Sequence, residues 1–291
     1  MQLKYKLTPY TFILPAMFII TVILIIPIFF AISISLTDAK LLAFSDAKFL
    51  GLQNYKTFFT DSNFRYVIRA TSIYVVGGVS FTYLFGLITA TILNQKIKGQ
   101  FIYRALMILP WAIPQVVLVL VFRWMLNPQY GVINFLLHSL RIIPRDFAWL
   151  SNVNLAIIAI LLVTLWKQYP IGCLILLAGM KSIPNEQYEA AAVDGANAIQ
   201  KFIHITIPGL RYVSAVLILL LVIWSFGNFV IIWLMTQGGP ANRTSTLTIF
   251  TYLNAFKFSK LGYASAIGFV CLLISLIFSI LYYVFFMKKL D

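Results

Sequence analysis

Six stretches of the chain contain no charged residue, and polar segments separate them. They are residues 7–37, 70–95, 105–122, 147–166, 212–242 and 261–287. A helix rises about 1.5 Å per residue, so roughly 20 apolar residues cross a hydrocarbon core of about 30 Å. The third stretch is short, but Arg104 and Arg123 can snorkel to the interfaces, and the fourth continues past Lys167 to about Gly179. We therefore predict one all-α integral membrane domain over residues 1–291, with six helices at about 10–36, 67–94, 101–126, 152–179, 210–235 and 262–287.

The composition excludes an ordinary soluble fold. Of the 291 residues, 61% are hydrophobic and only 10% are charged, whereas soluble domains contain about 25% charged residues. The net charge of +14 comes from cations spread between the apolar runs, and no nucleic-acid motif accompanies them, so we expect no nucleic-acid partner. The two cysteines lie inside apolar runs and are interpreted as packing residues.

The charges between the runs favour a cytoplasmic location for both termini. Ten Lys and Arg residues then face the cytoplasm and eleven lie in outer loops, so the raw count does not decide. The link 94–104 is basic and free of acids, and each tail has two lysines close to a helix end. The inner cations are Lys4, Lys6, Lys96, Lys98, Arg104, Lys181, Lys201, Arg211, Lys288 and Lys289. We predict a multi-pass protein of the bacterial cytoplasmic (inner) membrane.

The segment 182–208 between the fourth and fifth helices is polar and helix-forming. Gly195 is suited to end a first helix in the left-handed conformation, and Asn197 with Gln200 forms a capping pair that opens a second helix. Pro208 is expected to stop that second helix. The pattern predicts a helix-turn-helix along the membrane surface, and the alternative is an amphipathic linker that only covers the helix bundle.

The spacing of residues in this segment resembles a family signature. It reads E-A-A, three residues, Gly, nine residues, Ile, one residue, an apolar residue and Pro, and comprises Glu189, Ala190, Ala191, Gly195, Ile205, Ile207 and Pro208. This pattern resembles the membrane subunits of binding-protein-dependent ABC importers, although that family usually has Leu in place of Ile207. Four further stretches resemble the carbohydrate, maltose-permease branch in its six-helix form: 49–59, 108–114, 182–196 and 236–240. The resemblance covers nearly the whole chain.

The resemblance implies specific partners and a coupling role. Two homologous permeases would pair, an extracytoplasmic substrate-binding protein would deliver the sugar, and each E-A-A helix would insert into one of two ATPase subunits. ATP and Mg would be bound by those subunits, so this chain would have no cofactor and no enzymatic site of its own. The implied ATPase-coupling residues are Glu189, Ala190, Ala191, Asp194, Gly195, Phe202, Ile205 and Pro208.

Polar residues inside the predicted spans are candidates for a substrate pathway, because they are costly in a membrane. Tryptophans can stack on sugar faces beside amide and hydroxyl groups. We expect Trp111 and Gln115 to share one helix face. Alignment with the maltose-type permease implies a pathway that comprises Trp111, Gln115, Thr164, Lys167, Gln168, Ile171, Trp224, Ser225 and Asn228. Most of these identities differ from those of that permease, so the resemblance does not specify maltose.

Each of these residues also has a structural alternative. Ser225 could bond its own helix backbone, and Lys167 could pair with a carbonyl. If Lys167 were instead an unpaired buried ammonium, it would favour an anionic sugar. The turn-rich segment Gln237, Gly238, Gly239 and Pro240 faces the binding protein by resemblance, and a plain connecting loop is the alternative.

Other functions have less support. The chain lacks a phosphate-binding loop for ATP. His138 and His204 have no metal-binding partner at helical spacing, so we expect no metal. An ion-coupled secondary transporter or channel subunit remains the alternative, and that class predicts inverted repeats and ionisable groups in the membrane.

Overall fold

The computed structural model describes residues 12–95 and 98–287, and its regular elements are helices. Four helices are long and apolar enough to span a membrane: Phe12–Ser35, Phe64–Asn94, Ala156–Lys181 and Leu261–Phe286. Two bent helix pairs, at 100–125 and 198–227, raise the number to six if each is one span. This confirms the predicted all-α membrane fold. Residues 10 and 11, at the start of the first predicted helix, lie outside the described residues, as do Lys4, Lys6, Lys96, Lys288 and Lys289. The cytoplasmic location of the termini therefore stays a prediction.

The chain forms two compact units. Among its described residues, the first unit contains those up to Phe64 together with Phe250–Leu272. Its elements are the first span with η1 (Thr21–Ile25) and α2 (Ile26–Ser35), η2 (Phe44–Asp46), α3 (Gln53–Thr60), η4 (Leu253–Lys257) and the start of α15 (Leu261–Tyr282). Hydrogen bonds join these pieces: Asn54 donates to the carbonyl of Ser35 at 2.8 Å, and the Tyr263 hydroxyl donates to Asp61 at 2.9 Å. The single domain over 1–291 stays a prediction.

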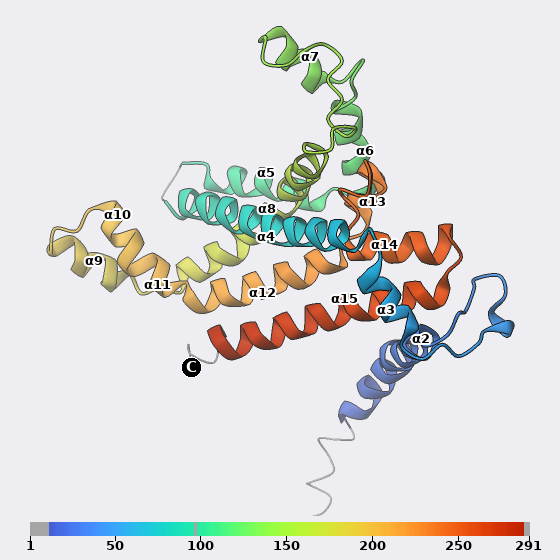
Figure 1. Cartoon of the computed structure of the whole chain (residues 1–291). Helices are drawn as coiled ribbons and strands as arrows, with labels where there is room; N and C mark the ends of the chain where they lie inside the picture. The colour runs from blue at the N-terminus through green and yellow to red at the C-terminus, as the bar shows by residue number, and fades with distance from the viewer. Residues whose placement is uncertain (1–11, 96–97, 288–291) are drawn as a thin grey trace, which may run out of the picture. The chain divides into compact units, whose positions relative to one another are not determined.

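Among its described residues, the second unit contains those of Arg65–Ile249 and those from Leu273 onwards. Its helices are α4 (Phe64–Asn94), α5 (Gln100–Ala112), α6 (Gln115–Met125), α7 (Val132–Ser139), α8 (Ala156–Lys181), α9 (Asn185–Val193), α10 (Ala198–Lys201), η3 (Phe202–Thr206), α11 (Ile207–Gly209), α12 (Arg211–Gly227), α13 (Val230–Thr236), α14 (Leu247–Tyr252, which extends into the first unit) and η5 (Tyr283–Met287). In Figure 1, α4, α8 and α12 lie together in this unit, and α9 to α11 project beyond the end of α8.

Small residues let α4 and α8 approach closely. A Cβ on Gly86 would stand 2.9 Å from the carbonyl carbon of Gly172, which is backbone and cannot give way. Such glycine contacts are typical of membrane helices, where van der Waals packing and not hydrophobicity drives association. The Tyr83 hydroxyl also meets Ser214 of α12 at 2.9 Å. These contacts hold three helices of the second unit in fixed positions.

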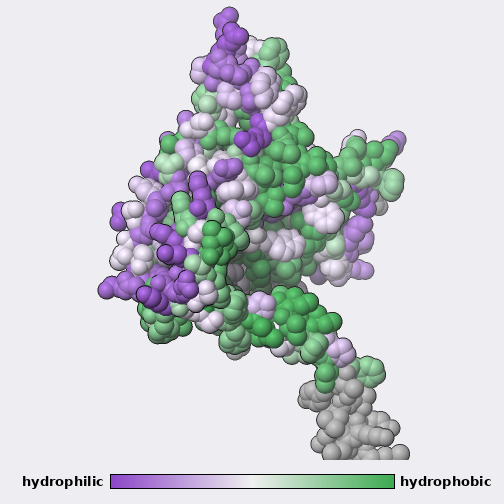
Figure 2. Space-filling model, turned by 90° about the vertical axis from the view of Figure 1, so that its right-hand side faces the viewer, coloured by the Kyte–Doolittle hydropathy of each residue, from purple (hydrophilic) through white to green (hydrophobic). Residues whose placement is uncertain are grey.

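The surface fits a lipid environment. Large apolar side chains are exposed along the first span, for example Phe12 at 81% and Phe29 at 66%. On the face drawn in Figure 2, apolar residues form broad areas, and polar residues gather in separate patches. Soluble monomers rarely expose apolar areas of this extent. These exposed apolar side chains therefore agree with the predicted membrane location.

Two predicted helices are broken in the structure. The helix predicted over 101–126 is two helices, α5 and α6, at 91° to one another. Ile113 between them is extended (φ −65°, ψ 133°), because a residue before proline is sterically pushed out of the helical region and Pro114 lacks an N–H donor. The helix predicted over 210–235 also ends early, at Gly227, where Asn228 is extended (φ −74°, ψ 116°) before α13 begins.

The ends of two other elements also differ from the predictions. The fourth helix begins at Ala156 and not at 152. Pro208 does not stop the second coupling helix, because it lies in the first turn of α11, where a missing N–H is tolerated. The π-helical turn η3 precedes it. The chain bends by 66° only after Gly209, between α11 and α12.

Candidate functional site

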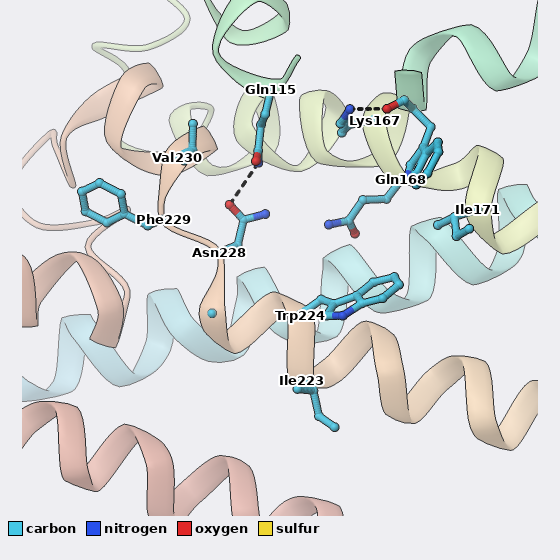
Figure 3. A pocket seen from close by; sticks show the side chains of 11 residues that line it. Gln115, Lys167, Gln168, Ile171, Ile223, Trp224, Asn228, Phe229 and Val230 are labelled. Carbon is cyan, nitrogen blue, oxygen red and sulfur yellow. Dashed lines mark hydrogen bonds between the residues drawn. The ribbon is translucent and has the colours of Figure 1, made fainter. Parts of the chain in front are cut away.

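A cavity of about 540 Å³ lies in the second unit where the two helix breaks face α8 (Figure 3). Its lining comes from the end of α5, the start of α6, the middle of α8 and the α12–α13 break. The lining residues are Trp111, Gln115, Lys167, Gln168, Ile171, Ile223, Trp224, Gly227, Asn228, Phe229 and Val230. Seven of the nine predicted pathway residues are thus brought together around one space.

The breaks create this arrangement. Trp111 and Gln115 do not share a helix face as expected, because the turn at Ile113 and Pro114 separates them. Each still reaches the cavity, Trp111 from α5 and Gln115 from α6. The Gln115 amide donates to the Asn228 side chain at 3.5 Å, which connects one break to the other. Figure 3 draws this bond between the side chains of Gln115 and Asn228.

Lys167 binds the end of α5. Its ammonium donates to the carbonyls of Trp111 and Ile113 at 2.6 Å each and to that of Pro110 at 3.4 Å. The last carbonyls of a helix lack partners within the helix and form the negative end of its dipole. An ammonium from the neighbouring helix satisfies them here. The alternative that Lys167 pairs with carbonyls is therefore confirmed, and an anionic sugar stays a prediction.

The remaining polar groups of the lining are amides. Gln115, Gln168 and Asn228 face the same space as the aromatic rings of Trp111 and Trp224. The amide of Gln168 points between Asn228 and Trp224 in Figure 3. Its Oε1 atom is buried and has no hydrogen-bond partner among the described residues. A buried unpaired acceptor is costly, so this oxygen is suited to receive a hydrogen bond from a ligand hydroxyl.

Two predicted pathway residues, Thr164 and Ser225, are not part of the lining of this cavity, and their place in the pathway stays a prediction. Thr164 is fully buried and bonds the Tyr74 hydroxyl at 3.2 Å. Ser225 donates to the carbonyl of Leu221 in its own helix at 2.7 Å, as its structural alternative predicted. Both lie next to Gly78 of α4, within 4 Å of where its Cβ would be. They hold α4, α8 and α12 together and do not face the cavity.

Sequence reasoning missed four lining residues: Ile223, Gly227, Phe229 and Val230. Three are apolar side chains in an apolar run and one is a glycine, so nothing in the pattern separates them from core residues. The break at Asn228 brings Phe229 and Val230 to the lining, whereas Ile223 and Gly227 belong to α12. Phe229 additionally stacks on Trp233, with ring centroids 5.5 Å apart.

The segment 182–208 has the predicted helix-turn-helix form. Gly195 follows the end of α9 and has the left-handed conformation expected there, with φ +78°. The capping box is present, with Asn197 N–H donating to Gln200 at 2.8 Å and Gln200 N–H to Asn197 at 2.9 Å. The hydroxyls of Tyr188 and Thr206 meet at 2.9 Å and join the two helices. The segment is therefore a small ordered hairpin.

Its predicted coupling residues are largely accessible. Glu189, Ala190, Asp194, Gly195 and Pro208 are exposed. Ala191, Phe202 and Ile205 are half-buried between the two helices. A linker that only covered the bundle would bury its apolar side chains, yet Val193 is 88% and Ile199 is 70% exposed. This surface is suited to binding a partner.

The segment 237–240 belongs to a compact turn. Gln237 is exposed with φ +53°, whereas Gly238 is buried with φ +87°. The hydroxyl of the buried Thr244 meets Thr236 at 2.7 Å and donates to the carbonyl of Gly239 at 2.7 Å. The loop is thus internally bonded around Thr244. Contact of Gln237, Gly238, Gly239 and Pro240 with a binding protein stays a prediction.

Within the part of the chain that the structure describes, no group of three His, Cys, Asp or Glu residues could hold a metal ion. The described spans also contain no Asp or Glu. The lining thus combines one ammonium engaged by carbonyls, three amides and two indoles with apolar groups.

Comparison with known proteins agrees with this picture. The family model described as "binding-protein-dependent transport system inner membrane component" matches residues 82–289. A probable ABC transporter permease protein of Brucella suis is 33% identical over 96% of both chains. The trehalose/maltose transport system permease protein MalF of Thermococcus litoralis is 33% identical over 97% of this chain and 95% of its own, and the sulfoquinovosyl glycerol permease protein SmoG of Agrobacterium fabrum is 32% identical over 92% and 86%.

Solved structures share the fold. A chain of a bacterial ABC transporter involved in the import of the acidic polysaccharide alginate superposes with a TM-score of 0.85, over 99% of both chains. The sequence identity is 20%, so this likeness bears on the fold alone. The helix breaks and the hairpin after α8 therefore lie in a known permease architecture.

Proposed function

Because the chain belongs to the family of inner membrane components of binding-protein-dependent transport systems, we propose that it is the membrane subunit of an ATP-driven carbohydrate importer. In this role it passes a sugar or oligosaccharide from a substrate-binding protein through the membrane to the cytoplasm. The relatives named for trehalose/maltose and sulfoquinovosyl glycerol transport support a carbohydrate.

The observation that carries the substrate class is the cavity at the two helix breaks. Indole faces of Trp111 and Trp224 are suited to stack on the apolar faces of a sugar ring. The amides of Gln115, Gln168 and Asn228 offer both donors and acceptors to hydroxyls. Lys167 is engaged by carbonyls, and its ammonium remains part of the lining. The volume of about 540 Å³ falls within the range of small-ligand sites.

The coupling segment gives the chain its link to ATP. A second homologous permease completes the pathway, and two ATPase subunits bind the hairpins of the pair through Glu189 and the neighbouring alanines. Closure of the ATPase pair moves the hairpins and shifts the population between inward- and outward-open cavities. Gly195 permits the turn that this docking needs, and the capping box keeps the hairpin rigid enough to transmit force. ATP and Mg are bound by the ATPase subunits and not by this chain.

Uptake by the whole complex tests the proposal. The two permeases and two ATPase subunits are reconstituted in liposomes with the binding protein, and accumulation of labelled trehalose and maltose is measured with and without ATP. We expect accumulation that requires both ATP and the binding protein, and that falls at least 10-fold in Trp224→Ala. Accumulation by this chain alone, driven by an ion gradient, contradicts the proposal and favours a secondary transporter.

A further inference from the structure

The connection between α6 and α8 is a built structure and not a plain loop. Asn134 of α7 is buried, and its amide donates to the carbonyls of Pro128 at 3.2 Å and Phe147 at 2.8 Å. Its oxygen accepts from the indole N–H of Trp149. A Cβ on Gly131 would stand 2.4 Å from two backbone oxygens, so only glycine fits there. The fold thus fixes residues 127–149 in one arrangement.

This connection encloses a second hollow of about 440 Å³ that the substrate cavity does not include. Three segments contribute to its lining: the turn before α7, α7 itself and the turn after it. The side chains that matter here are Gln129, Tyr130, Phe135, His138, Arg145 and Asp146. The rest of α6, which begins at Gln115 and ends at Met125, separates the cavity from this connection, which amounts to about 15 Å along the helix axis.

The polar groups around the hollow are uncommitted. The structure assigns no side-chain hydrogen bond or ion pair to Gln129, Tyr130, Arg145 or Asp146, and all four are exposed. His138 uses only Nδ1, opposite the carbonyl of Ile143 at 3.3 Å. The backbone frame beneath these groups is bonded through Asn134, and their donors and acceptors are available to a ligand.

The chemistry of these groups selects among ligands. Tyr130 and Phe135 are 61% and 71% exposed and present aromatic faces, which suit the C–H face of a pyranose. Arg145 supplies donors and Asp146 next to it supplies acceptors, and a sugar hydroxyl needs both. Arg145 would attract a phosphate or a sulfate, and Asp146 next to it would repel one. An uncharged saccharide uses the donors and the acceptors together without that repulsion.

We propose that the hollow formed by Gln129, Tyr130, Phe135, His138, Arg145 and Asp146 is a second saccharide-binding site, separate from the cavity at the helix breaks. The choice of a saccharide rests on the proposed transport function. The site lies before the N-terminal end of α8, and the coupling hairpin follows its C-terminal end, so the site belongs to the side away from the ATPase subunits. It retains a sugar, or one end of an oligosaccharide, near the entrance to the pathway.

Equilibrium binding to the complete permease–ATPase complex in detergent, without the binding protein, tests this site. Labelled maltose and trehalose serve as probes. The double variant Arg145→Gln/Asp146→Asn removes both charges and keeps the backbone, because asparagine tolerates the φ of +59° at position 146. The matched control is Arg141→Gln, an exposed arginine of the same connection that does not line the hollow. Monodispersity and ATPase activity of each variant report folding.

We expect two binding sites per permease of this kind in the wild-type complex and in Arg141→Gln. The double variant should weaken one of them at least 10-fold, and Trp224→Ala should weaken only the other. A single site that is lost in Trp224→Ala and unchanged in the double variant overturns the second site and leaves the transport proposal intact. Absence of both binding and ATP-driven uptake for either sugar instead overturns the transport proposal, and the saccharide assignment falls with it.

Discussion

Replacing Lys167 by methionine should destabilise the C-terminal end of α5. The substitution keeps the length of the apolar stem and removes the ammonium that binds three carbonyls. Without it the carbonyls of Trp111 and Ile113 lose their partner, since Pro114 has no N–H and Ile113 is extended. Trp111 lies at this end of the helix, so its indole should no longer be held against the cavity.

The magnitude follows from the bond lengths. A hydrogen bond to a charged group contributes about 1.5–3 kcal/mol in soluble proteins, and hydrogen bonds between membrane helices contribute about 0.6–1.7 kcal/mol. Two bonds at 2.6 Å, with a half-exposed lysine that water can partly replace, give a loss of about 2 kcal/mol. The bond at 3.4 Å adds little. A loss of about 2 kcal/mol is about 30-fold in an equilibrium constant.

The assay is ATP-driven uptake in proteoliposomes at limiting sugar, with a neutral sugar and an acidic sugar in parallel. If Lys167 fixes the helix end, Lys167→Met should lower uptake of both sugars by the same factor, between about 10-fold and 100-fold. Lys167→Arg retains donors for the carbonyls and should recover part of the loss. The matched control is Lys181→Met, at the exposed end of the same helix. Uptake within twofold of wild type, or a loss confined to the acidic sugar, would refute this reasoning.

Three further changes have defined outcomes. Glu189→Lys should abolish ATP-driven uptake while membrane insertion, followed by protease protection, is unchanged; Glu186→Lys on the same exposed helix is its control, and normal uptake by the Glu189 variant removes the coupling role. Gly195→Ala meets no atom within 4 Å but must adopt φ +78°, so it should destabilise the hairpin turn by about 1 kcal/mol and lower ATPase stimulation several-fold; an unchanged stimulation contradicts this. Thr164→Val removes the bond to Tyr74 and should lower the melting temperature without changing the sugar KM, since the residue does not line the cavity; a KM shift above 3-fold would place it in the pathway.

The sequence alone determined the class of fold and the hairpin. Charge-free runs of about 20 residues leave few alternatives to membrane spans, because the hydrocarbon core sets the length and excludes charge. The turn at Gly195 and the capping box of Asn197 and Gln200 depend only on residues close in sequence. Local chemistry therefore predicted them, and both are present in the structure.

Only the tertiary structure decided where the spans break and which side chains face the cavity. Pro110, Pro114 and Pro170 all lie in predicted spans, yet α8 continues through Pro170 whereas the chain turns by 91° at Pro114. The difference arises because a helix end in a membrane needs a partner for its carbonyls, and Lys167 supplies it from another helix 54 residues away. A local sequence pattern cannot predict such a distant partner. Nor could it predict Phe229 and Val230, which the second break brings to the lining of the cavity. The same geometry keeps Thr164 and Ser225 out of the lining of this cavity, because neighbouring helices bury them.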